Sequence, residues 1–111
     1  MAKRKVRHVH HLSDDGGDLL DVNLDIEKGK VRRFALNYRA SINGKWHIVY
    51  RVDNYHGFLH EQRFWISKEL IPLEEEERTY NTYYIVEMYS ERIALNYTSY
   101  KKYYLAKLNG R

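Results

Sequence analysis

The sequence predicts an α+β domain, in which an antiparallel meander of three or four strands is covered on one face by a single long C-terminal helix. Apolar and polar residues alternate over residues 20–52, as in strands that have one apolar and one polar face. Apolar and aromatic residues then recur at steps of three and four over residues 85–108, as on one stripe of a helix. A chain of 111 residues has the size of one domain.

Three segments between residues 19 and 53 are expected to be strands because apolar and polar side chains alternate along them. The first is LLDVNLDI, which ends at the turn EKGK; the second is VRRFALNYRASI, and the third is KWHIVYRVD. A fourth strand is expected in FLHEQRFWI, residues 58–66, although both of its faces mix apolar and polar side chains. The alternation predicts a sheet with one face packed and one face in water.

The turn at residues 43–44 joins the second strand to the third, and the length of its loop decides which side chains pair. A two-residue loop would put Tyr38 opposite Val49, which mixes the apolar set of one strand with the polar set of the next. A three-residue loop, residues 42–44, puts Tyr38 opposite Ile48 and keeps the apolar sets together. We therefore predict the three-residue loop.

The last segment, residues 82–108, predicts a long helix, with Gly110 suited to the position after its end. Its apolar stripe consists of Ile85, Tyr89, Ile93, Tyr97, Tyr100, Tyr104 and Leu108. The acidic run before it, residues 74–77, is expected to be a solvated loop or the first turn of a helix, where negative charge is favourable. Pro72 argues against a long element just upstream.

The net charge of +4 is supplied by four basic residues near the start of the chain, because the other 15 basic residues balance 15 acidic ones. Residues 1–18 are therefore expected to be a basic, flexible tail and loop, and residues 19–111 the single α+β domain. The chain has no Cys, no signal peptide and no apolar run that could span a membrane. These features predict a soluble cytoplasmic protein with no membrane partner.

The stretch RVDNYHGFLHEQRFW, residues 51–65, is a candidate site because an Arg and two His lie around one predicted hairpin. Arg51, His56 and His60 are the candidate catalytic residues: a His pair can act as acid and base near neutral pH, and the Arg can stabilise a phosphate. A five-residue loop, residues 53–57, would put His60 on the apolar face opposite Tyr50. A single His at such a position is more often a hydrogen-bonded core residue.

The other residues of this loop are expected to be structural. Asp53 and Asn54 have side chains that make turns by bonding nearby backbone, and Gly57 can adopt a positive φ. The pattern contains no phosphate loop, nucleophile elbow or metalloprotease motif, so no metal and no cofactor is predicted.

The run RVDNYHGFLHEQRFW, preceded by NYRASINGKWHIVY, resembles a family of small archaeal and bacterial proteins and, more distantly, the TumE-type toxins of toxin–antitoxin systems. The matching positions are Arg51, Asp53, Asn54, His56 and His60. Where the family pattern continues into a further His, this chain has Gln62. The resemblance covers residues 31–66 and, loosely, the C-terminal helix. It implies a toxin-like or RNA-directed role, with an antitoxin or another protein as a partner.

The polar face of the sheet is expected to carry a basic patch that could follow a phosphate backbone. An ordinary solvated sheet face is the alternative. Trp65 is the one aromatic residue expected to be available there for stacking on bases. The candidate nucleic-acid-binding residues are Arg33, Arg39, Lys45, His47 and Arg63.

Two functions follow as hypotheses, and the sequence leaves open whether the protein is an enzyme. In the first, the protein is a toxin-like, RNA-directed domain in which Arg51, His56 and His60 form the working cluster. In the second, it is a non-catalytic interaction domain, in which the histidines are structural and the Tyr-rich helix mediates a homodimer or binds another protein.

Overall fold

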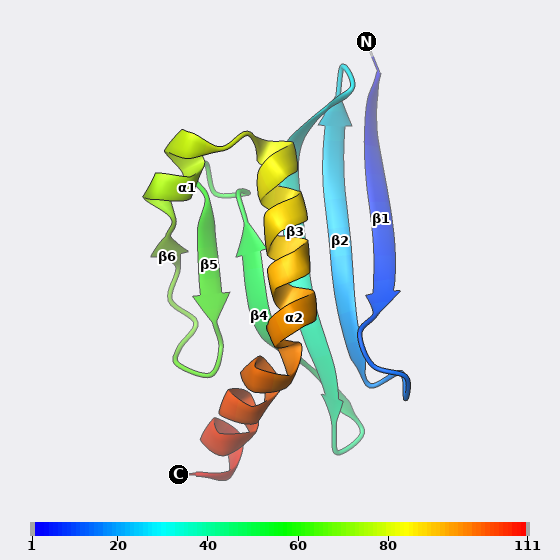
Figure 1. Cartoon of the computed structure of the whole chain (residues 1–111), viewed down its shortest axis with the longest axis vertical. Coiled ribbons are helices and arrows are strands. Elements are labelled where there is room, and N and C mark those ends of the chain that lie inside the picture. The colour runs from blue at the N-terminus through cyan, green and yellow to red at the C-terminus, as the bar shows by residue number, and fades with distance from the viewer. Residues whose placement is uncertain (1, 111) are drawn as a thin grey trace.

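Six antiparallel strands follow one another in chain order across a single sheet, and two helices lie on one side of it (Figure 1). The structure is a computed structural model that describes residues 2–110. The α+β class, the antiparallel sheet and the long C-terminal helix are confirmed, whereas the sheet has more strands than the three or four predicted. The strands are β1 (Lys3–His11), β2 (Asp18–Glu27), β3 (Lys30–Ile42), β4 (Lys45–Asp53), β5 (His60–Arg63) and β6 (Ile71–Pro72).

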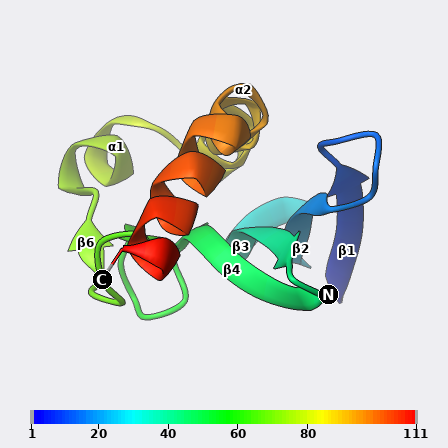
Figure 2. The same cartoon turned by 90° about the horizontal axis from the view of Figure 1, so that it is seen from below.

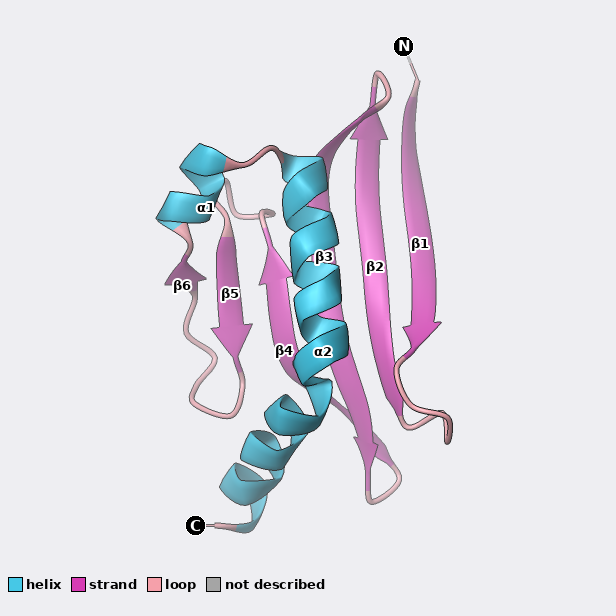
Figure 3. Cartoon of the chain, viewed as in Figure 1, coloured by secondary structure: helices cyan, strands magenta, loops and turns pink. Residues whose placement is uncertain are grey.

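The first added strand is β1, which lies where a flexible tail was predicted for residues 1–18. It pairs antiparallel with β2 from Lys3 opposite Glu27 to His11 opposite Leu19. That prediction was wrong because ladder hydrogen bonds are made by the backbone, so a strand at the sheet edge needs few apolar side chains. The second added strand is the two-residue β6, which pairs with β5 at the opposite edge (Figure 3).

The two helices are α1 (Glu74–Thr79) and α2 (Thr82–Asn109). The acidic run therefore forms the start of a helix, as one of the two predicted alternatives had it. Helix α2 begins where the side chain of Asn81 accepts a hydrogen bond from the backbone N–H of Tyr84, at 2.8 Å. Within residues 2–110, neither helix has the length and apolar character needed to cross a membrane.

The core lies between the sheet and α2, which packs on β2, β3 and β4 (Figures 1 and 2). Alternate residues of each strand point toward the helix, as the period-two pattern predicts. From the helix, Ile85, Val86, Tyr89 and Ile93 are buried in this layer. The sheet side of the core includes Leu20, Val22, Phe34, Leu36, Tyr38, Ala40, Tyr50 and Val52.

A β-bulge in the β3–β4 hairpin replaces the predicted three-residue loop. The loop has two residues, Asn43 and Gly44, both with positive φ (52° and 79°), and Ile42 pairs with Lys45. The register then shifts, because Arg39 is opposite Ile48 but Tyr38 is opposite Tyr50. Val49 is the extra residue, and it is fully buried. A two-residue loop with a regular ladder would have mixed apolar and polar sets, as the sequence indicates. The extra residue that prevents this lies in the bulge and not in the loop.

Candidate nucleic-acid interface

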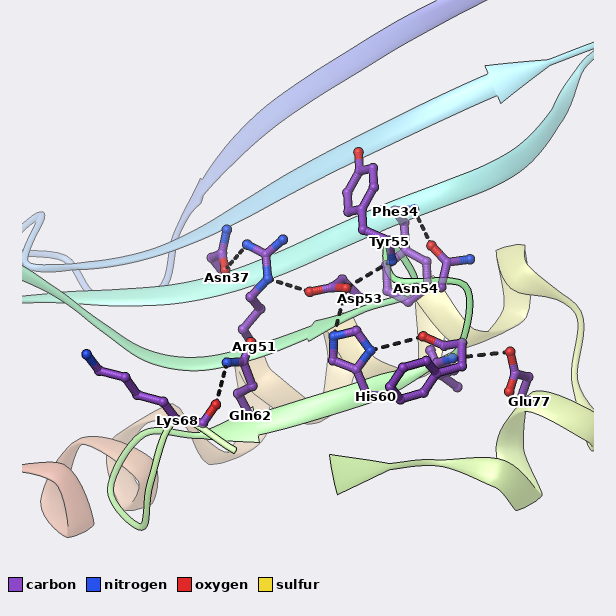
Figure 4. A network of polar contacts seen from close by, with 12 residues as sticks. Phe34, Asn37, Arg51, Asp53, Asn54, Tyr55, His60, Gln62, Lys68 and Glu77 are labelled. Carbon is purple, nitrogen blue, oxygen red and sulfur yellow. Dashed lines mark hydrogen bonds and ion pairs between the residues drawn. The ribbon is translucent and has the colours of Figure 1, made fainter. Parts of the chain in front are cut away.

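A chain of polar contacts links β4 to β5 through Asp53 (Figure 4). The Arg51 guanidinium donates from Nε to one carboxylate oxygen of Asp53 and from Nη1 to the side chain of Asn37, at 3.0 Å. The other Asp53 oxygen, Oδ1, lies 3.0 Å from His60 Nε2. His60 Nδ1 is 3.0 Å from the backbone oxygen of Phe58. The side chain of Asp53 is therefore held between an Arg and a His.

His60 lies inside this chain of contacts with no exposed surface. Its Nδ1 faces a carbonyl oxygen, so that nitrogen carries a proton and donates. Its Nε2 lies close to Asp53 but lacks the alignment of a hydrogen bond. Because both ring nitrogens face protein oxygens and neither is reached by solvent, His60 is placed to tie β5 to β4.

The position of His60 differs from the one predicted. The loop between β4 and β5 spans residues 54–59, so His60 is opposite Asp53, whereas Tyr50 is opposite Arg63. His60 therefore shares a sheet face with Asp53, on the side away from α2, and not with Tyr50. The prediction was wrong because one added loop residue reverses the face of every residue that follows.

The three candidate catalytic residues gather near Asp53 but differ in access. Arg51 is partly exposed, with 28% of its side chain in solvent. His56 is exposed, and its ring centre lies 5.4 Å from that of the sealed His60. A reacting phosphate could approach Arg51 and His56, but it could not reach His60 without movement of the loop.

The residues of the loop itself hold its backbone in place. Asn54 accepts a hydrogen bond from the backbone N–H of Phe34, at 2.9 Å, and donates one to the backbone oxygen of Arg32, at 3.2 Å. Asp53 accepts from the backbone N–H of Tyr55, at 3.0 Å, which is an Asx-type turn. Gly57 has a φ of 86°, a conformation that favours glycine.

The predicted basic patch is divided between the two faces of the sheet. Arg33 and Arg39 lie on the face away from α2, which we call the open face. Lys45, His47 and Arg63 are opposite Ile42, Ala40 and Tyr50, respectively, which all face the helix. His47 also contacts the Tyr104 hydroxyl of α2, at 3.0 Å. The prediction that all five share one face was wrong for two reasons: the bulge at Val49 reverses the face of Lys45 and His47, and the loop of residues 54–59 reverses the face of Arg63.

The open face carries two aromatic rings, each covered by an arginine of β3. The Arg39 guanidinium lies 4.8 Å from the ring centre of Trp46, and that of Arg33 lies 5.1 Å from the ring centre of Tyr55. Trp46 is 48% exposed. The two arginines are six positions apart along β3, which is roughly 20 Å of extended strand. Arg51 lies between them in the sheet, opposite Asn37.

Two adjoining hollows occupy the β1 side of the open face. The smaller, of about 280 Å³, is lined in part by Arg7, Asn23, Arg51 and Tyr55. The larger, of about 510 Å³, is lined in part by Lys3, Arg32 and Arg33. Lys5 and Asp25 line both, so the two hollows adjoin at this ion pair.

Acidic residues of β2 balance part of this positive charge. Asp25 pairs with Lys5 at 3.2 Å and with Arg33 at 3.3 Å, and Asp21 pairs with Arg39 at 2.8 Å. The side chains of Lys5 and Arg33 are nevertheless 77% and 55% exposed. Exposed pairs of this kind contribute about 0–1 kcal/mol, so their cations remain available to an incoming anion.

A family described as a domain of unknown function, DUF7718, matches residues 1–109 of the chain. The chain belongs to this family. No curated protein and no solved structure matches it. The resemblance to TumE-type toxins therefore stays a prediction.

Sequence reasoning missed two aromatic residues on the open face of this DUF7718 domain. Trp46 was expected on the apolar face, and the bulge moves it to the open one. Tyr55 lies in a loop, where no periodicity indicates a direction. Trp65, the expected stacking residue, instead packs on Tyr50 and Tyr100 on the helix side, with ring centres 6.1 and 5.0 Å apart. The basic residues of β1 were not predicted to bind nucleic acid because residues 1–18 were expected to form a flexible tail.

Proposed function

We propose that this DUF7718 domain binds single-stranded RNA on the open face of its sheet. The observation that carries the proposal is the pairing of an aromatic ring with an arginine at two places on one uncovered face, half-exposed Trp46 with Arg39 and partly buried Tyr55 with Arg33. RNA is proposed over DNA because the sequence resembles TumE-type toxins over residues 31–66.

The chemistry of the open face suits an unpaired strand. Bases of a single strand are free to stack on aromatic rings and on guanidinium planes, and every base offers such a surface. Arginines beside the rings can bind the phosphates, which repel the carboxylates of Asp21 and Asp25. A duplex keeps its bases stacked inside, so it would gain only the phosphate contacts.

Fluorescence anisotropy of a labelled RNA of about ten nucleotides tests the proposal. Trp46→Ala is expected to weaken binding roughly 5- to 150-fold, which corresponds to the usual loss of one base-stacking contact. Arg39→Ala is expected to weaken binding and to reduce its dependence on salt. Single-stranded DNA of the same sequence shows whether the 2′-hydroxyl matters.

Arg92→Ala is the matched control for Arg39→Ala. Arg92 also covers an aromatic ring, that of Tyr89, at 4.5 Å, but it lies on α2 on the other side of the sheet. Both substitutions remove one positive charge and one cation–π contact. The proposal fails if the two variants lose the same affinity for RNA, or if the wild-type protein binds an RNA duplex as tightly as the single strand.

Cleavage of RNA by Arg51, His56 and His60 stays a prediction, and the burial of His60 does not favour it. Absence of RNA cleavage by the wild-type protein would leave binding as the whole activity, and equal cleavage by the wild-type protein and the His56→Ala variant would exclude His56 from the reaction. The alternative function, a non-catalytic interaction domain that forms a homodimer or binds another protein through α2, is also a prediction. Sedimentation that shows a monomer at high protein concentration would contradict the homodimer.

A further inference from the structure

We propose that the free edge of β1 binds an extended, acidic segment of a partner protein, which adds to the sheet as one more strand. Strand β1 is the outermost strand of the sheet at its N-terminal edge. The edge is nine residues long, and in the described part of the chain no helix or loop pairs with it. An uncovered edge of this length is a template for strand addition.

The backbone groups that are free at this edge belong to the odd-numbered residues. At one end of the strand, Leu12 N–H donates to Asp18 O at 2.8 Å, and at the other, Lys28 N–H donates to Ala2 O at 3.3 Å. The β1–β2 register is the same from end to end, so every second residue of β1 bonds to β2. Because Ala2 and Leu12 make such bonds, the bonding residues are the even-numbered ones. The N–H and C=O groups of the odd-numbered residues point away from the sheet.

The charge on this edge has one sign. Residues 3–11 contain four Lys or Arg, three His and no acidic residue. Lys3, Lys5 and Arg7 are odd-numbered, so residues whose backbone groups point outward also carry cationic side chains on the open face. Lys5 is 77% exposed even though it pairs with Asp25. A partner strand that carries acids would therefore gain both the ladder and the charge pairs.

The same charges argue against a second copy of this chain as the partner. Because β1 contains no acid, no register of two β1 strands places opposite charges next to each other. The register that pairs the whole strand about a two-fold axis puts Arg7 opposite its own copy. Like charges directly opposite each other destabilise a strand pair.

Strand geometry sets the sequence pattern of the partner. In the added ladder, residues opposite Lys3, Lys5 and Arg7 have side chains on the open face, and the residues between them point to the helix side, next to Val6. The partner segment should therefore have acids at every second position and an apolar residue between two of them.

A heptapeptide of sequence Glu-Val-Glu-Thr-Glu-Val-Glu, with blocked ends, is a direct probe. Isothermal titration is expected to show binding, and hydrogen exchange is expected to slow at the amides of Lys5, Arg7 and Val9. N-methylation of the glutamate amides, which face β1, should weaken binding at least about tenfold because it removes several ladder bonds. N-methylation of the three other amides should leave it nearly unchanged. Equal affinity of the two methylated peptides, or of a peptide with its four glutamates contiguous, would overturn the proposal.

Val9→Pro tests the edge from the side of the protein. The substitution removes one outward N–H without removing a charge or a bond to β2, and proline is tolerated at such edge positions. Peptide binding should fall while the circular dichroism spectrum and RNA binding stay as in the wild type. Undiminished peptide binding by a folded Val9→Pro variant would contradict strand addition. If this variant does not fold, Lys5→Glu replaces it, and unchanged affinity for the peptide would then overturn the proposal.

Discussion

The two faces of the sheet each display one tryptophan, and the two rings have different neighbours. On the helix face, Trp65 packs in a cluster with Tyr50 and Tyr100, in which each ring contacts the other two. On the open face, Trp46 is covered by the Arg39 guanidinium and is half exposed. An aromatic ring packed on other rings contributes to stability, whereas one held beside a cation at the surface is free to contact a ligand.

The largest expected effect is on the free energy of unfolding, which should differ between substitutions on the two faces. Phe34 has no exposed surface, and Phe34→Ala is expected to lower the free energy of unfolding by about 3–5 kcal/mol because it leaves a cavity under α2. Trp46→Ala, on the open face, should lower it by less than about 1 kcal/mol. Urea unfolding followed by circular dichroism measures both. Similar losses for the two variants would contradict the assignment of Trp46 to an uncovered surface.

The next largest effect is expected at Asp53, which lies on the open face but is buried. Asp53 is 1% exposed and contacts both Arg51 and His60. Asp53→Ala is expected to cost about 2–3 kcal/mol because it leaves the Arg51 Nε–H and the Tyr55 N–H without their acceptor and removes the carboxylate beside buried His60. His56→Ala is the control and should cost less than about 0.5 kcal/mol, since His56 is exposed. Equal losses at the two positions would contradict the structural role assigned to the Asp53–His60 contact.

The smallest effect is expected from alkaline pH, and it arises on the helix face. Burial, together with the neighbouring Asp18 and Glu61 carboxylates, raises the pKa of Tyr38 and of Tyr50 well above the ordinary range. Burial also raises the pKa of Tyr89 to about 12. In the unfolded chain these hydroxyls lose their protons near pH ~10. The folded state keeps them longer, so their contribution is intact below that pH and is lost as pH rises through the folded-state values.

Urea midpoints measured at pH 8, 9, 10 and 10.5 test this effect. The urea midpoint should be constant up to about pH 9 and should then fall, because these tyrosines begin to ionise in the unfolded chain. Tyr50→Phe removes one titrating group from the core and should make the fall shallower. A fall of unchanged steepness in this variant would show that other groups control the alkaline limit.

The helix and the apolar face of the sheet could be predicted because their patterns are long. The stripe from Ile85 to Tyr104 repeats over five turns, and the alternation from Leu20 to Ala40 spans two strands. Patterns of this length stay recognisable when a single residue does not fit the repeat. The chain of contacts from Arg51 to His60 could be predicted only as a cluster, since its geometry depends on the loop between them.

The bulge could not be predicted, because two different local arrangements would both pair the apolar residues of β3 with apolar residues of β4. One extra residue in the turn at Gly44 and one extra residue at Val49 both bring Tyr38 back into line with an apolar neighbour. The choice depends on how residues 45–48 pack against α2 and on the positive φ of Asn43, neither of which the alternation reports. Strand β1 was missed for a different reason, since its stability comes from backbone pairing with β2.

The bulge at Val49 also determines how the hairpin would respond to a change in chain length. Deletion of this single residue would restore an uninterrupted pleat without turning the tip, because Ile48 and Tyr50 already lie on opposite faces of the sheet. Trp46 would stay on the open face opposite Ser41, and His47 would stay on the helix face opposite Ala40. The extra residue thus adds one buried side chain to β4 and leaves the indole and the imidazole on the faces that the turn at Asn43 and Gly44 gives them.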